Sequence, residues 1–95
     1  MMLSVINANY LGDYKIALSF DNGKNGIANL HDVIFTDSRV PFLTLRDENE
    51  FKKFKIEHGT LTWESGLDLA PEFLFFVVFQ EVSEFQHQFK QWGYL

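Results

Sequence analysis

Three residues in the second half of the chain are of types that could bind a ligand. Trp63 offers an aromatic face, and Asp68 and Glu72 offer two carboxylates a few residues further on. An indole beside two carboxylates could bind a basic peptide or a small cation. Alternatively, Trp63 fills the core and Asp68 closes a turn or caps the following helix, and we favour this structural interpretation. Acid–base catalysis by Asp68 and Glu72 would also need a pocket and shifted pKa values.

The remaining chemistry-bearing residues do not form a catalytic pattern. His31, His58 and His87 are far apart and lack the spacing of metal ligands. The chain has no Cys, which excludes a thiolate zinc site, a disulfide framework and a cysteine nucleophile. It also lacks a glycine-rich phosphate loop and a Gly-x-Ser-x-Gly elbow. The sequence therefore predicts a protein that is not an enzyme and that has no metal and no cofactor.

The charge of the chain argues against nucleic acid as a partner. Eight Lys and Arg face thirteen Asp and Glu among 95 residues, a net charge of −5. Binding to a phosphate backbone needs clustered basic residues, and the only local cluster, at residues 52–55, is surrounded by Glu. A basic protein partner suits this surface better. No apolar run approaches the ~20 residues of a membrane helix, and residues 1–5 lack a signal-peptide pattern, so we expect a cytoplasmic protein without membrane contact.

The first thirty residues predict an antiparallel meander. Apolar residues alternate over Leu3–Tyr10 and most clearly over Tyr14–Phe20, and a third strand follows over Lys24–Leu30. Gly12-Asp13 and Asp21–Lys24 provide the two turns, the second being a typical hairpin signal.

The middle of the chain predicts shorter elements. We expect a turn of helix over 31–35, an extended loop over 40–43 because of Pro41, and a short helix over 48–54. Asp47 and Glu50 have capping-box spacing at the start of that helix. Strands are predicted over 55–57 and 60–64, around a turn at His58-Gly59. The residues expected to be nearly fully buried are Leu18, Phe20, Phe51, Phe54 and Trp63.

The last quarter predicts one long helix. Pro71 suits the first helical position, and the helix would run to about Gln91. A rival interpretation is a strand to about residue 80 followed by a short helix, because residues 73–79 are rich in β-formers. The long helix is favoured by an apolar seam with spacing 3, 4, 3, 4 and 3. The seam consists of Phe75, Val78, Val82, Phe85, Phe89 and Trp92.

The start of this helix would be apolar on every side. Residues 73–79 contain no polar side chain, and one thin sheet can cover only one side of a helix. We therefore expect a second copy of the chain, or a small protein partner, to cover the other side. The predicted interface consists of Phe75, Val78, Phe79, Val82, Phe85, Phe89 and Trp92.

Three stretches of the chain carry a family resemblance. Residues 14–23, 42–47 and above all 62–74 resemble a small prokaryotic family known as domain of unknown function 2442. The similarity covers about residues 3–75, which leaves residues 76–95 as a helical extension of a single domain. The chain departs from the family at Glu64, where members often have Pro, and in its longer tail.

The resemblance implies a compact α+β domain with no established activity. Members often look like one half of a two-gene pair, in a toxin–antitoxin-like arrangement. Some relatives carry a helix-turn-helix domain, for which the tail here is too short.

Together these observations predict an α+β fold in which an antiparallel sheet of about five strands is packed by a short middle helix and a long C-terminal helix. The leading functional hypothesis is a non-enzymatic protein-interaction module that self-associates through the C-terminal helix. The alternative is a small-molecule-binding protein or enzyme with a pocket near Trp63 and Asp68.

Overall fold

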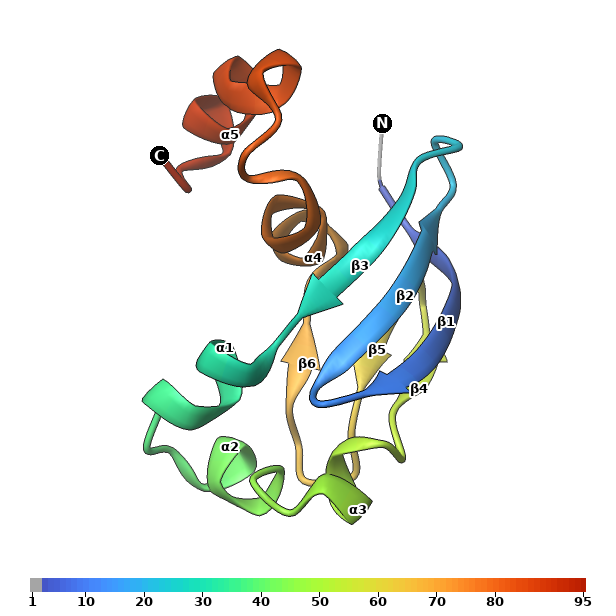
Figure 1. Ribbon diagram of the computed structural model, residues 1–95, viewed down its shortest axis with the longest axis vertical. Coiled ribbons are helices and arrows are strands. Elements are labelled where there is room, and N and C mark those ends of the chain that lie inside the picture. Colours follow the sequence, from blue (N-terminus) through green and yellow to red (C-terminus); the bar gives the residue numbers. More distant parts are fainter. Residues whose placement is uncertain (1–2) are drawn as a thin grey trace.

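The computed structural model describes residues 3–95 and has an α+β fold with antiparallel strands, as predicted. The strands form two three-stranded sheets, one in front of the other in Figure 1. The prediction of a single sheet of about five strands is therefore wrong. The first sheet contains β1 (Val5–Gly12), β2 (Lys15–Phe20) and β3 (Asn25–Asn29); the second contains β4 (Lys55–Glu57), β5 (Thr60–Thr62) and β6 (Asp68–Leu69).

The first sheet is the predicted meander, with β2 in the middle. The hairpin between β2 and β3 turns at Asn22-Gly23, where Gly23 has a φ of 85° and the Asn22 side chain accepts a hydrogen bond from the Lys24 amide. Alternate residues of β2 point into the core: Ile16, Leu18 and Phe20 are buried.

The second sheet is built around the predicted turn at His58-Gly59, where both residues have positive φ, as a tight hairpin requires. A chain segment with three short helices separates β3 from β4, so β4 pairs with β5 and not with the meander. A backbone hydrogen bond links the two sheets, because the Val5 amide donates to the Gly59 carbonyl at 2.8 Å. Strand β6 was not predicted because it has only two residues.

Three short helices, α1 (His31–Thr36), α2 (Val40–Thr44) and α3 (Glu48–Phe51), lie together at one end of the sheets (Figure 1). The predicted turn of helix over 31–35 is confirmed by α1. The extended loop predicted over 40–43 is wrong, because Pro41 lies in the first turn of α2, where its missing amide hydrogen is not needed.

Helix α3 is shorter than the predicted 48–54 and begins differently. Asp47 is its N-cap, but its carboxylate accepts from the Asn49 amide at 3.0 Å. The Glu50 side chain accepts a hydrogen bond from Lys53 instead, so the predicted capping box does not form.

Helix α3 holds the middle of the core together through Phe51. The centre of its ring lies 4.5 Å from that of Tyr14, in the turn between β1 and β2, and 5.6 Å from that of Trp63, directly after β5. Phe51 therefore joins the connections next to the two sheets. The predicted burial of Leu18, Phe20, Phe51 and Trp63 is confirmed. Phe54 is only half-buried, because α3 ends before it and leaves its ring at the edge of the core.

The C-terminal segment is a helical hairpin (Figure 1). It contains α4 (Pro71–Phe79), a 3-10 turn η1 (Ser83–Phe85) and α5 (Gln86–Trp92). The long helix predicted from Pro71 to Gln91 is therefore wrong, and so is the rival strand through residue 80. At the bend, the Gln86 side chain donates to the carbonyls of Gln80, the C-cap of α4, and Val82, at 2.9 and 3.0 Å.

The hairpin also explains how an all-apolar helix is covered. Phe75 of α4 contacts Phe20 of the first sheet, with ring centroids 5.1 Å apart, and Phe89 of α5, at 6.2 Å. Phe76 packs edge-on against Phe89 at 5.1 Å. A straight helix would have left this second side of α4 in water, so folding back is the lower-energy arrangement.

Candidate functional site

An open groove of about 800 Å³ lies beside β6. The turn and strand at residues 66–70 form one wall, and the segment that joins α1 to α2 forms the other. Its floor is apolar and its rim carries a few polar groups. The apolar floor consists of Val33, Pro41, Phe42, Leu67, Leu69 and Phe73.

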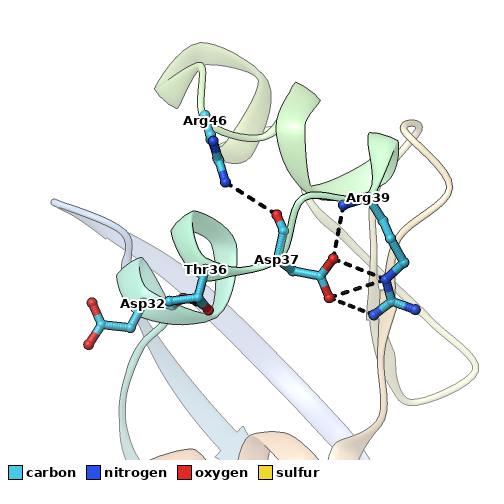
Figure 2. A network of polar contacts seen from close by, with 5 residues as sticks. All are labelled: Asp32, Thr36, Asp37, Arg39 and Arg46. Carbon is cyan, nitrogen blue, oxygen red and sulfur yellow. Dashed lines mark hydrogen bonds and ion pairs between the residues drawn. The ribbon is translucent and has the colours of Figure 1, made fainter.

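An ion pair fixes the helical rim of this groove. The Asp37 carboxylate accepts from the Arg39 backbone amide, Nε and Nη2, the last at 2.6 Å (Figure 2). These hydrogen bonds hold the pKa of Asp37 down at about 2. The Arg39 guanidinium in turn lies 5.2 Å from the centre of the Phe42 ring. Asp37 is therefore ionised at neutral pH and neutralised by its neighbour, so it cannot act as a general acid or base.

A second arginine, Arg46, binds backbone carbonyls of the segment between α1 and α2. Arg46 Nη2 donates to the carbonyls of Phe35 and Asp37, at 3.1 and 3.3 Å, and so binds the end of α1 (Figure 2). The Arg46 carbonyl accepts from the Tyr14 hydroxyl at 2.8 Å. This network therefore links the segment after α1 to Arg46 and, through the Arg46 carbonyl, to Tyr14.

The other wall offers backbone groups as well as a carboxylate. Asp68 is exposed and pairs with Thr62 of β5. The Trp63 amide donates a hydrogen bond to the Leu67 carbonyl. In an antiparallel ladder hydrogen-bonded and non-hydrogen-bonded residue pairs alternate, so the next pair, Thr62 and Asp68, has no backbone hydrogen bonds between its two residues. The amide and carbonyl of Asp68 therefore point away from β5, along the free edge that lines the groove.

The structure does not bring Trp63, Asp68 and Glu72 together. Trp63 is buried, and its Nε1 donates to the Phe51 carbonyl at 2.7 Å. Asp68 lines the groove, whereas Glu72 lines a separate small cavity of about 330 Å³ beside Trp92. The aromatic platform with two carboxylates does not form, because Trp63 fills the core, as the favoured interpretation predicts. The predicted capping role of Asp68 is wrong: Asp68 lies in β6, and the N-cap of α4 is Ala70, which has no side-chain cap hydrogen bond.

The three histidines do not meet either. His31, His58 and His87 are exposed, and residues 3–95 contain no group of three His, Asp or Glu placed to hold a metal ion. His31 stacks on Phe35, with ring centroids 4.5 Å apart.

The predicted interface residues of the C-terminal segment fall into two groups. Phe75 and Phe89 are buried between α4 and α5. The others keep part of their surface in solvent, and Val82, at the bend, is the most exposed with 36%. This second group consists of Val78, Phe79, Val82, Phe85 and Trp92.

Sequence reasoning missed the groove-lining pair Asp37 and Arg39. Their signal is local: an Asp two residues before an Arg, just ahead of Pro41, is typical of a side-chain-closed turn before a helix. The groove itself has no local signal, because its walls come from segments thirty residues apart.

Comparison with known proteins gives one match. The family model described as "Protein of unknown function (DUF2442)" matches residues 5–77. Neither a curated protein nor a solved structure matches the chain. Within residues 3–95, no helix has the length and hydrophobicity needed to cross a membrane.

Proposed function

The chain belongs to the DUF2442 family, and we propose that it is a non-enzymatic protein-interaction module that self-associates through its C-terminal helical hairpin. The observation that supports this is that part of the apolar surface of the hairpin remains exposed to solvent. Val82 is 36% exposed, and Phe79 and Phe85 are half-buried beside it, at the bend between α4 and η1. Apolar side chains gathered at one place on a small domain are typical of a protein-binding surface.

A second copy is the simplest partner for this surface. Two-fold dimers are the commonest assembly, and they bury the same patch on both copies. In the two-gene arrangement that the family resemblance implies, the other small protein would bind the same bend and displace the second copy.

Sedimentation tests this proposal at micromolar concentration. We expect the wild-type chain to be a dimer and Val82→Lys to be a monomer, because a charge would lie inside the interface. Val40→Lys is the matched control, since Val40 is 71% exposed on α2, at the other end of the molecule. A monomeric wild-type chain, or a Val82→Lys variant that stays dimeric, would refute self-association through this surface.

The groove beside β6 favours a second candidate function, the binding of a small cation or a basic peptide. Its volume of about 800 Å³ lies within the range of ligand sites, and Asp68 places an exposed carboxylate on its rim. NMR titration with spermidine and with a Lys-rich tetrapeptide would test it. Shifts confined to the groove that are lost in Asp68→Asn would support binding; shifts spread over all acidic surfaces would contradict it.

A further inference from the structure

Strand β3 presents backbone groups that no described residue binds. It lies at the edge of the first sheet and pairs only with β2. The Leu30 amide donates to the Tyr14 carbonyl. Because hydrogen-bonded residues alternate along an antiparallel strand, the backbone amides and carbonyls of the even-numbered residues of β3 bond to β2. The amides and carbonyls of Asn25, Ile27 and Asn29 therefore point outward, away from the sheet.

This edge lacks the features that usually prevent strand pairing. Natural edge strands carry a charge, a proline or a bulge. Residues 25–29 read Asn-Gly-Ile-Ala-Asn, and their register with β2 is regular. Ile27 is 56% exposed on the outer face. The bulges of this sheet lie in the pairing of the opposite edge strand, β1.

The sequence of β3 is symmetric about Ile27, with small residues next to it and asparagines beyond. We propose that β3 pairs in antiparallel fashion with β3 of a second copy, about a two-fold axis at Ile27, which joins the two meanders into one six-stranded sheet. The inference rests on the proposed self-association and names its geometry. Ile27 then lies opposite Ile27 of the copy, and Asn25 lies opposite Asn29. Three outward-facing residues in each copy would form about six hydrogen bonds.

The self-complementary register identifies the partner as a second copy. A two-fold axis requires a strand that matches itself when it is reversed, and Asn-Gly-Ile-Ala-Asn does so in size and polarity. An uncharged strand also lets two chains of net charge −5 approach without opposing like charges at the contact itself.

The same axis brings the C-terminal hairpins into the interface. Phe79 and Val78 of α4 pack directly on Gly26, and the Lys24 ammonium lies 5.9 Å from the centre of the Phe85 ring. Five paired residues bury less than the ~800 Å² per partner of a stable interface. The half-exposed apolar residues beside β3 supply the remaining area, since an axis perpendicular to the sheet places both α4 helices on one face.

Two single-cysteine variants test the register, because the chain has no cysteine of its own. Asn25→Cys and Asn29→Cys proteins are mixed and treated with a short bis-maleimide. We expect a mixed product that joins position 25 of one copy to position 29 of the other. Little self-product should form from either variant, because identical positions would lie about 14 Å apart along the strands. Equal amounts of all three products, or no mixed product, would overturn the proposal.

A proline variant tests the backbone contacts. Ile27→Pro removes an amide that bonds no residue of β2, so the fold should survive and the dimer should weaken at least tenfold. Ile27→Thr is the control, since it keeps the amide and should stay dimeric. If Ile27→Pro fails to fold, the crosslinking result decides alone.

The outcomes separate this inference from the proposed function. A dimer that dissociates in Val82→Lys but persists in folded Ile27→Pro would refute β3 pairing and leave self-association through the hairpin intact. A wild-type monomer would refute both.

Discussion

Gly26 of β3 and Val78 of α4 lie so close together that a β-carbon at Gly26 would overlap the Val78 side chain. Gly26 has no positive φ, so it is needed for this approach and not for a turn. The contact fixes α4 on the inner face of β3, and through α4 it fixes the whole C-terminal hairpin.

Gly26→Ala should therefore destabilise the fold by about 1–3 kcal/mol, since overpacking forces β3 and α4 apart. Urea unfolding measures the change. Val78→Ala makes room for the new methyl group, so the double variant should recover part of the loss relative to the sum of the single variants. Strict additivity would show that the two residues are not in contact.

Trp63 should stabilise the fold in two ways, through the burial of its ring and through the hydrogen bond that its indole N–H donates. Trp63→Phe leaves the Phe51 carbonyl without its donor and should cost about 1–3 kcal/mol. Trp63→Ala also opens a cavity and should cost about 3–5 kcal/mol. Val40→Ala, at a side chain 71% exposed, should change stability by less than ~0.5 kcal/mol. Equal unfolding curves for Trp63→Phe and wild type would contradict the role of the hydrogen bond.

The Asp37 carboxyl should titrate at about 2, below its ordinary pKa of 3.8, because Arg39 donates hydrogen bonds to its charged form. Because the pKa of Asp37 is lower in the folded state, its ionised form stabilises the fold at pH values above 3.8, and this stability is lost as the pH falls towards 2. NMR of the side-chain carboxyl measures it. Arg39→Gln should raise the pKa of Asp37, and an unchanged value would show that the ion pair does not form in solution.

Tyr10 should ionise above its ordinary pKa of 10.0, first because of desolvation and then because its hydroxyl donates to Glu48. A raised pKa gives stability that is present below pH 10 and is lost as the pH rises through the folded-state value. The difference in absorbance between wild type and Tyr10→Phe isolates this group. Glu48→Gln should lower the pKa of Tyr10; a value that rises instead would contradict the assigned contact.

The residues predicted to be buried show which parts of the core can be inferred from the sequence pattern alone. Leu18 and Phe20 alternate along a strand, and Phe51 and Trp63 are large aromatics flanked by polar residues. Their burial follows from periodicity and size. Phe54 has the same chemistry but lies beyond the end of α3, and that end depends on contacts that the local sequence does not contain.

The sequence by itself determined the local elements: the meander of residues 3–30, the turns at Asn22-Gly23 and His58-Gly59, and the start of α4 at Pro71. Each depends on neighbouring residues, through alternation, positive φ or a fixed φ. Only the tertiary structure decided that the strands form two sheets, that α4 ends at Phe79, and that Asp68 faces the groove while Trp63 faces the core. These features depend on which distant segment covers an apolar surface. That choice is a free-energy balance over the whole chain, and no local pattern records it.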